Sequence, residues 1–541
     1  MTKHLLSAVA FSSLLVACGG PDNDPNHLPD APVAEEPATL WVSADPKLPI
    51  LQGTVGHIEV TIERKEGANG PVAITAEDLP PGVAVEQVVI EATETSATLA
   101  FTANADAPHS LPTQILVRAT LGTSAAVTPV TLTVYGPPGS LDTSFGGGRV
   151  MLPAGVSDDY ANAVVVQPDG KIILGGRGAE NAGDFALIRL ERDGSVDTSF
   201  GNNGRVLTDF AGTSDSINAL VLQTDGKIVA VGSTVGANST DFALARYMPD
   251  GSLDGSFGQG GKVTHSITDD TDIAYAALVT VDGFIVVGGS ANTGNNATGV
   301  DFALARFAPS GQLDRNFGTQ GVTLSAFRPG TAGDHIYALA FQPLDGEQRI
   351  VAAGGEGDMV VARYRSNGTL DTDFGAGGSV LNVLGSTIGA AYAVAITPEG
   401  NIALAGHSHN DVAIVQLGSD GAVDDLFGTN GKVITPVTSN WDAARALAID
   451  TAGKLVVAGW AWEGNSSAGD FVTLRYLTKG QLDPSFGSGG IVITPMAAGA
   501  KADESRAIAI QLDDRVPTHR FVVAGWANND TADFAVARFW R

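Results

Sequence analysis

The sequence predicts an all-β protein in which a small β-sandwich precedes a seven-bladed β-propeller of four-stranded antiparallel blades. Three observations support this fold class. The segment Gly139–Gly146 (GSLDTSFG) recurs seven times along the chain. The pieces between its copies have the length of strands, and none has the 3.6-residue apolar period of a helix. The 67 glycines and 26 prolines among 541 residues supply many turns.

Residues 1–17 have the features of a lipoprotein signal peptide. Lys3 and His4 precede an apolar run that ends at Val16 and is too short to span a bilayer. The sequence Leu-Val-Ala-Cys that ends at Cys18 resembles the bacterial lipobox, in which the signal is cleaved before a cysteine that then carries lipid. This resemblance implies that acylated Cys18 binds the lipid bilayer. An ordinary signal peptide with an unpaired cysteine near its end is the alternative.

The residues after the cysteine indicate where the protein is anchored. Gly19 rather than aspartate follows Cys18, and by resemblance to enterobacterial sorting rules this implies a lipid anchor in the outer membrane of a bacterial cell envelope. Residues 18–38 hold five prolines and five acidic residues. This composition predicts a disordered acidic tether between the lipid and the folded part.

Residues 39–136 predict the β-sandwich. Apolar residues alternate with polar ones in segments such as Gly56–Ile62 and Ala97–Phe101, with turns every ten or so residues between them. The Leu-Pro-Pro-Gly-Val turn at Leu79–Val83 resembles a turn of bacterial immunoglobulin-like domains. The resemblance implies a spacer, so we assign this domain no site.

Residues 139–541 predict the propeller. Each copy of the repeat contributes a phenylalanine, and successive copies are 53 to 60 residues apart, with four strand-length segments per repeat. A period of this length with four strands is typical of a propeller blade. A β-solenoid is the alternative, although its rungs are shorter. The repeated phenylalanines are Phe145, Phe200, Phe257, Phe317, Phe374, Phe427 and Phe486.

The two ends of this region predict how the ring closes. The last repeat supplies only three strand segments, ending with Asp533–Phe539, and the missing fourth strand is found at Arg149–Leu152. Pairing these segments would leave that blade without an exposed edge.

The repeated motifs carry a further resemblance. GSLDxSFGxGGxV, QPDGKI and DFALARY in seven ordered copies resemble the delta-60 repeat, a bacterial propeller family of unknown function, over Gly139–Arg541. The resemblance implies a fold but no activity.

Charge and motifs exclude several functions. The chain has 31 Lys and Arg against 59 Asp and Glu, a net charge of −28, which would repel nucleic acid. The glycine-rich turn after each phenylalanine precedes a strand rather than a helix, so it is not a phosphate loop. The sequence contains neither a Gly-x-Ser-x-Gly nor a His-Glu-x-x-His motif, and we expect no cofactor and no metal. His407, His409 and Asp411 have spacing that could bind zinc, but no supporting pattern accompanies them.

The repeats differ most at one end of the ring. Tight Asp-Gly turns and the Leu-Asp-x-x-Phe-Gly turns share one face, whereas loops of variable length, such as Ser290–Val300, lie on the other, which we call the variable face. One position of each first strand lies at the mouth of the channel on this face. It reads Asn162, Asn218, Tyr275, Tyr337, Tyr392, Arg445 and Arg506.

These positions predict a ligand site rich in aromatic and cationic side chains. Four of the six tryptophans fall in the repeats that carry the two arginines. Flat aromatic faces beside arginine suit stacking of a glycan or binding of a peptide. Packing between blades is the alternative, with each arginine paired to the aspartate that begins a third strand. The candidate residues are Tyr275, Tyr337, Tyr392, Trp441, Arg445, Trp460, Trp462, Arg506 and Trp526.

Two other functions stay open. Carboxylates in the loops between blades could supply a general acid and base for a hydrolase or lyase acting on glycans, and a purely structural envelope protein needs only the tether and the ring. The sequence favours non-catalytic binding by a membrane-anchored lipoprotein that faces the cell surface or the periplasm. The loop carboxylates are Asp158, Asp159, Asp215, Asp270, Asp272, Asp334, Asp442, Asp503 and Glu504.

Overall fold

The structure is a computed structural model. It describes residues 40–541 apart from 66, 111, 179–182, 211–213, 237–238, 295–298, 329–332, 386–388, 463–468, 498–501 and 513–518. The predicted signal peptide, Cys18 and the tether lie outside the described residues. Within the described part of the chain, no helix has the length and apolar character needed to cross a membrane.

The first folded unit consists of two sheets with a shared core. The sheet orders are β1-β3-β7-β5 and β2-β9-β8-β4-β6, and only β2 and β9 pair in parallel among these strands. Buried side chains of both sheets, such as Val60, Phe101 and Val117, form one apolar cluster. The strands are β1 (Leu40–Ala44), β2 (Lys47–Leu51), β3 (Val55–Arg64), β4 (Val72–Glu77), β5 (Val83–Val85), β6 (Val88–Ile90), β7 (Ser96–Ala103), β8 (Thr113–Leu121) and β9 (Ser124–Tyr135).

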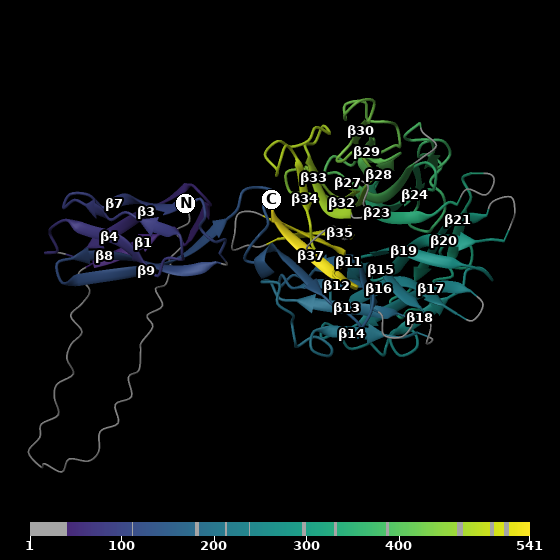
Figure 1. The fold of residues 1–541 in the computed structure, drawn as a ribbon, viewed down its shortest axis with the longest axis horizontal. Coiled ribbons are helices and arrows are strands. Elements are labelled where there is room, and N and C mark those ends of the chain that lie inside the picture. Colours follow the sequence, from purple (N-terminus) through teal and green to yellow (C-terminus); the bar gives the residue numbers. More distant parts are fainter. Residues whose placement is uncertain are drawn as a thin grey trace, which may run out of the picture.

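The rest of the described chain forms four-stranded antiparallel sheets arranged in a ring, with the sandwich to one side (Figure 1). Their orders are β10-β37-β36-β35, β11 to β14, β15 to β18, β19 to β22, β23 to β26, β27 to β30 and β31 to β34. A short 3-10 turn, η1 (Gly146–Gly148), precedes β10. The all-β class and the four-stranded antiparallel repeat are therefore confirmed.

The inner strands of the ring are the first and second strands of each sheet. The first strands are β11 (Tyr160–Val166), β15 (Asp215–Leu222), β19 (Asp272–Val279), β23 (Ile336–Leu344), β27 (Gly389–Ile396), β31 (Asp442–Ile449) and β35 (Asp503–Gln511). The second strands are β12 (Ile172–Gly178), β16 (Ile228–Val235), β20 (Ile285–Asn292), β24 (Glu347–Gly354), β28 (Ile402–Ser408), β32 (Leu455–Trp462) and β36 (Arg520–Asn528).

The outer strands complete each sheet. The third strands are β13 (Asp184–Leu190), β17 (Thr240–Tyr247), β21 (Val300–Phe307), β25 (Val360–Tyr364), β29 (Asp411–Leu417), β33 (Gly469–Tyr476) and β37 (Ala532–Trp540). The fourth strands are β10 (Arg149–Leu152), β14 (Arg205–Thr208), β18 (Lys262–His265), β22 (Val322–Ser325), β26 (Ser379–Val380), β30 (Lys432–Thr435) and β34 (Ile491–Thr494).

Neighbouring sheets meet through their first strands. Each first strand contacts the next one along the chain, and β35 contacts β11. The fourth strand beside β37 is β10, in a register that places Val150 opposite Val536. Segments from the two ends of this region thus lie in one sheet.

An arginine of the third strand holds the repeated turn in place. Arg189 Nε lies 2.6 Å from Asp197 Oδ2, and the guanidinium lies over the ring of Phe200 with its Cζ 4.5 Å from the ring centroid. Arg189 also donates to the carbonyl of Pro249 in the next sheet. The turn aspartate also accepts a local amide, since Asp197 accepts from Ser199 N at 3.0 Å.

This pairing recurs from sheet to sheet. The partners of the third-strand arginines are the turn aspartates. The pairs are Arg189–Asp197, Arg246–Asp254, Arg306–Asp314, Arg363–Asp371, Arg475–Asp483 and Arg538–Asp142. Buried charge pairs that recur from sheet to sheet belong to the scaffold, so no ligand role is assigned to them.

The sandwich contacts the ring through His109 and Tyr135. His109 Nδ1 accepts hydrogen bonds from Thr143 N at 3.2 Å and from Trp540 Nε1 at 3.0 Å. The imidazole also meets the indole of Trp540 edge to face, at 5.6 Å between centroids, and Tyr135 lies 6.1 Å from the same indole. This junction joins the end of β37 to the sandwich.

Candidate functional site

The seven side chains predicted to lie at the channel mouth each belong to a β-bulge. In every first strand the register to the second strand shifts across a single residue, as between Ala444 and Ala446 in β31. The residue skipped in each register is one of those that the sequence places at the mouth, and we call these seven residues the collar. They are Asn162, Asn218, Tyr275, Tyr337, Tyr392, Arg445 and Arg506. A bulge leaves its extra residue out of the ladder and redirects the side chain.

A glycine of the second strand makes room for each bulge. A Cβ built on Gly459 would lie 1.9 Å from the carbonyl oxygen of Ala443, two residues before Arg445. Corresponding contacts of 1.7 to 2.0 Å recur in all seven sheets. Since backbone oxygen cannot yield at low cost, any larger residue would disturb the bulge. The glycines are Gly176, Gly232, Gly289, Gly354, Gly406, Gly459 and Gly525.

The aromatic collar residues form a continuous series of ring contacts. Ring centroids are 5.2 Å apart for Tyr275 and Tyr337 and 5.1 Å apart for Tyr337 and Tyr392. Two histidines stack on this series: His335 on Tyr337 at 5.6 Å and His407 on Tyr392 at 5.6 Å. Rings at these separations attract each other beyond their burial of apolar area.

The series continues into three of the predicted tryptophans. The ring centroid of Trp441 lies 6.1 Å from that of His407, 6.0 Å from that of Trp460 and 6.1 Å from that of Trp462. The centroids of Trp460 and Trp462 lie 5.1 Å apart. Trp441 is 42% exposed, whereas Trp460 is only 8% exposed. Trp441 therefore presents an indole to solvent above buried rings.

The arginines of the collar share one carboxylate. Glu504 lies 3.2 Å from Arg445 Nε and 3.0 Å from an Nη of Arg506, and Trp526 Nε1 donates to it at 3.2 Å. The two arginines hold the pKa of Glu504 below its usual range, although burial acts in the opposite direction. This pairing differs from the expected alternative, in which each arginine would meet a third-strand aspartate.

Polar and cation-π contacts complete the collar. The Cζ of Arg445 lies 4.1 Å from the ring centroid of Tyr392. Arg506 donates to Asn162 Oδ1 at 2.7 Å, and Asn162 donates to the carbonyl of Ile217 at 2.8 Å. Asn218 in turn donates to the carbonyl of Ala274 at 2.8 Å. Each collar residue thus touches the neighbouring sheet, so the collar serves packing as well as presenting its side chains to the channel.

The structure separates Trp526 from the other candidate tryptophans. Its ring lies 5.3 Å from Tyr160, and its indole nitrogen reaches Glu504. Among the described contacts, the path from Trp526 to Trp441 runs through Glu504, Arg445, Tyr392 and His407. The nine candidates therefore form an aromatic arc ending at Trp462 and a charged sector around Glu504.

Burial keeps the titratable rings of the arc uncharged. Desolvation, together with the charges of Arg445 and His409, lowers the pKa of His407 to about 4. Desolvation also lowers the pKa of His335 and raises the pKa of Tyr275 and Tyr337. At neutral pH the arc is therefore a set of neutral rings.

Sequence comparison within the chain missed three residues that contact the collar. Tyr160, His335 and Glu504 each lie two positions before a collar residue. The same position holds Ser216, Ile273, Ala390 and Ala443 in the other repeats. Comparing the repeats at the position two residues before the collar would have identified Tyr160, His335 and Glu504 as different from the small or aliphatic residues of the other repeats.

Most loop carboxylates considered for catalysis hold backbone instead. Asp442 is buried and accepts from the amides of Val437 and Thr438 at 2.8 and 2.7 Å. Asp159, Asp215, Asp272, Asp334 and Asp503 likewise each accept a backbone amide. Asp158 and Asp270 also accept backbone amides, and Glu504 pairs with the arginines. These carboxylates are thus engaged with backbone amides or with arginines.

One acidic group stands apart from this pattern. Carboxylate oxygens of Asp184, Asp209 and Asp215 lie within 4.8 Å of one another. Burial and the charge of Asp209 raise the pKa of Asp215, while Lys262 acts against this. Among the described residues, this is the one group of three or more His, Cys, Asp or Glu side chains close enough together to hold a metal ion. It does not include His407, His409 or Asp411.

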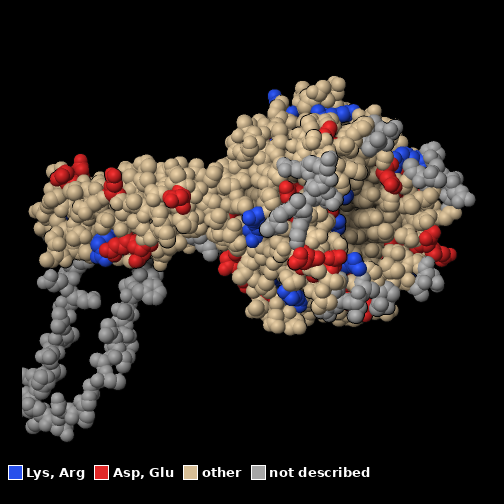
Figure 2. Space-filling view, viewed as in Figure 1, with Lys and Arg blue, Asp and Glu red and all other residues tan. Residues whose placement is uncertain are grey.

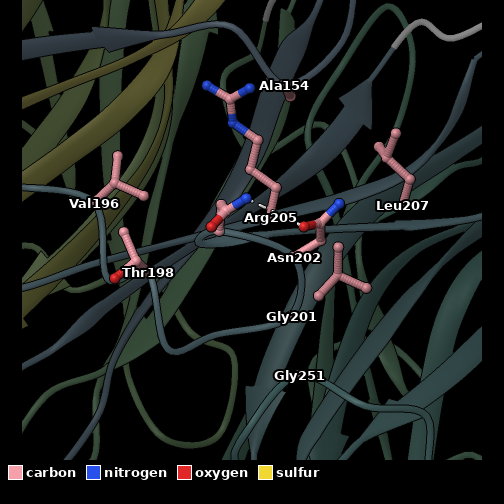
Figure 3. Close-up of a pocket in the computed structure, with 10 residues that line it drawn as sticks. Ala154, Val196, Thr198, Gly201, Asn202, Arg205, Leu207 and Gly251 are labelled. Atoms are coloured by element: carbon pink, nitrogen blue, oxygen red, sulfur yellow. Dashed lines mark hydrogen bonds between the residues drawn. The ribbon is translucent and has the colours of Figure 1, made fainter.

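One well-formed cavity is lined by residues outside the collar. It has a volume of about 770 Å³ and is lined by residues of the third-to-fourth-strand turn, including Val196, Asn202 and Arg205, and by Gly251 of the next sheet (Figure 3). A cavity of about 550 Å³ occupies the same place one repeat later, beside Gln259 and Lys262. Because the cavity recurs, it follows from how neighbouring sheets meet. A third cavity, of about 380 Å³, lies in the channel among apolar first-strand residues such as Val164, Leu220 and Phe341.

Charge is distributed in small groups on the visible surface. Figure 2 shows acidic and basic side chains in scattered groups among other residues, with no broad basic patch on this face.

Comparisons with known proteins agree with the fold. A model of the DUF5122 β-propeller domain of unknown function matches residues 167–200, 223–257, 282–317, 348–374 and 453–486. Each matched segment ends on a phenylalanine of the repeated turn. These matches support a β-propeller repeat family whose function is unknown. No curated protein matches the chain.

Two solved structures show weak similarity. A protein of unknown function from Porphyromonas gingivalis is 9% identical, with 42% of this chain and 98% of that chain covered and a TM-score of 0.16. A DUF4784 family protein from Bacteroides caccae is also 9% identical, with 73% of this chain and 95% of that chain covered and a TM-score of 0.25. Scores this low carry no argument about this chain.

Proposed function

We propose that this chain is a non-catalytic binding module: a seven-bladed propeller, closed by pairing of β10 with β37, that holds a ligand at its collar. The observation that carries the proposal is the unbroken series of ring contacts from Tyr275 to Trp462, with an indole 42% exposed at Trp441. Exposed aromatic surface above a rigid, buried support is typical of a binding site. The ligand we propose is a glycan or a peptide.

The backbone supports this role. The bulges set the direction of the collar side chains, and the glycines facing them leave no freedom for a different register. The collar is therefore organised before a ligand arrives, which reduces the entropy lost on binding.

A tryptophan fluorescence titration tests this function. The full chain in detergent is titrated with cell-wall glycans, neutral and acidic polysaccharides, and peptides. We expect a saturable change that Trp441→Ala weakens at least about tenfold and Trp41→Ala leaves intact. Trp41 is a matched control because it is also exposed, at 51%, but lies in the sandwich. A saturable change that persists in Trp441→Ala would place the site elsewhere.

We also propose that lipid on Cys18 anchors the protein in a bacterial envelope, by the outer membrane, with an acidic tether and an immunoglobulin-like spacer between lipid and propeller. The lipobox-like sequence and the single cysteine support this. Labelling of growing cells with a palmitate analogue tests it: the wild-type chain becomes labelled, and Cys18→Ser does not. Equal labelling of both would refute it.

A further inference from the structure

The aromatic arc and the histidines stacked on it hold buried polar atoms that find no hydrogen-bond partner in the described part of the chain. They include Trp460 Nε1 and His407 Nδ1, and both of these side chains are 8% exposed. His335 Nδ1, at the other end of the arc, is a third such atom. An unpaired buried polar group costs about 1–3 kcal/mol. Atoms of this kind are expected where a ligand completes the bonding.

The exposed indole of Trp441 contacts the two rings that carry the unpaired nitrogens Nδ1 of His407 and Nε1 of Trp460. A ligand that stacks on Trp441 would therefore lie next to both rings.

The charges of the site favour an uncharged ligand. Glu504 already forms ion pairs with Arg445 and Arg506 and accepts a hydrogen bond from Trp526 Nε1. An acidic ligand would have to displace this carboxylate to reach the arginines. The low pKa of His407 keeps that imidazole neutral, able to accept a hydrogen bond at one nitrogen and to donate one at the other. The net charge of −28 also repels polyanions.

Resting on the proposed binding function, we propose that the ligand is a neutral saccharide whose ring stacks on Trp441 and whose hydroxyl groups bond to Trp460 Nε1 and His407 Nδ1. Hydroxyl groups both donate and accept, which matches an indole N–H and an imidazole nitrogen. The apolar face of a pyranose ring matches an aromatic face. Glu504 excludes acidic ligands by keeping the collar arginines paired.

Matched hexamers test the proposal by calorimetry on the full chain in detergent. The probes are cellohexaose and maltohexaose as neutral sugars, hexagalacturonate as an acidic sugar, and hexaglutamate as an acidic peptide. We expect at least one neutral hexamer to bind, Trp441→Ala to weaken it at least about tenfold, and Trp41→Ala to leave it unchanged. Both acidic probes should bind at least about tenfold more weakly than the neutral hexamer.

A second variant tests the role of Glu504. Glu504→Gln keeps the size of the side chain and removes its charge, so Arg445 and Arg506 become available. We expect hexagalacturonate to bind this variant at least about tenfold more tightly than it binds the wild type. Circular dichroism melting establishes that both variants are folded.

The outcomes separate the two proposals. Binding of only an acidic probe to the wild type, lost in Trp441→Ala, would overturn the neutral saccharide and leave the binding function in place. Binding of no hexamer to the wild type would overturn the neutral-saccharide proposal. If the wider panel of glycans and peptides also gave no saturable change, the binding function would fall too.

Discussion

The guanidinium of Arg445 lies over the ring of Tyr392, with its Cζ 4.1 Å from the ring centroid. On its other side Arg445 meets Glu504. Tyr392 belongs to β27 and Arg445 to β31, so this contact joins two neighbouring sheets and links the aromatic arc to the charged sector of the collar. The guanidinium makes a cation-π contact and an ion pair at the same time. These two contacts stabilise its charge within a site whose other side chains are mostly neutral.

The bulge that orients Arg445 depends on Gly459. Gly459→Ala places a Cβ 1.9 Å from the carbonyl of Ala443, and we expect the free energy of unfolding to fall by about 3 kcal/mol. Denaturant unfolding measures this. Gly255→Ala is the control, because a Cβ there meets no atom within 4 Å. Equal stability of the two variants would show that the bulge is not constrained by this glycine.

The neutral state of His407 predicts a pH dependence of stability. Its pKa is about 4 in the folded protein against 6.5 for the free side chain, so the unfolded chain binds the proton first as the pH falls. The stability contributed by neutral His407 is present above pH 6.5 and is lost between there and pH 4. His407→Gln should reduce the stability lost between pH 7 and pH 4 by about 2 kcal/mol. An unchanged loss in the variant would contradict this assignment.

His109 predicts a pH-sensitive junction between sandwich and ring. Its Nδ1 accepts two N–H groups, and burial lowers its pKa. The junction is therefore intact while His109 is neutral and weakens as the pH falls below the usual 6.5, because protonated Nδ1 would face two donors. Small-angle X-ray scattering should show a broader distribution of shapes at pH 4.5 than at pH 7.5. His109→Gln offers an acceptor that does not titrate, and the same change in this variant would refute the prediction.

The carboxylates of Asp184, Asp209 and Asp215 repel one another within the group. Asp209→Asn removes one charge, so we expect the free energy of unfolding at pH 7 to rise by about 0.5–1 kcal/mol and the gain to vanish as the pH falls through the carboxylate range. Asp425→Asn, at an exposed position, is the control. Lower stability of Asp209→Asn would show that Asp209 contributes more through its bonds than it costs through repulsion.

The repeat made much of this architecture predictable. The copies of Gly139–Gly146 and the strand-length segments between them predicted the all-β class and the four-stranded antiparallel sheets, because turn chemistry and two-residue periodicity are local properties. The seven collar residues were also predicted, since alignment of the seven repeats identifies a position at which they differ. The sequence did not predict the β-bulge at that position.

The partners of the collar could not be predicted in the same way. Glu504 was grouped with loop carboxylates such as Asp503, yet Asp503 is buried against backbone amides while Glu504 meets two arginines. The two residues are adjacent in sequence and face opposite ways on one strand, so only the register of β35 distinguishes them. Similarly, the rings that contact His407 come from two places, Tyr392 in β27 of the same sheet and Trp441 just before β31 of the next.

Indole signals of the six tryptophans test the central claim most directly. Two-dimensional NMR of the full chain in detergent, with ¹⁵N-labelled tryptophan, resolves the Nε1–H groups as cellohexaose or maltohexaose is added. The account predicts saturable shifts for Trp441, Trp460 and Trp462, largest for the unpaired Nε1 of Trp460, while Trp41 in the sandwich and Trp540 at the junction stay fixed. Shifts confined to Trp41 or Trp540, or no shift at saturating sugar, would contradict it.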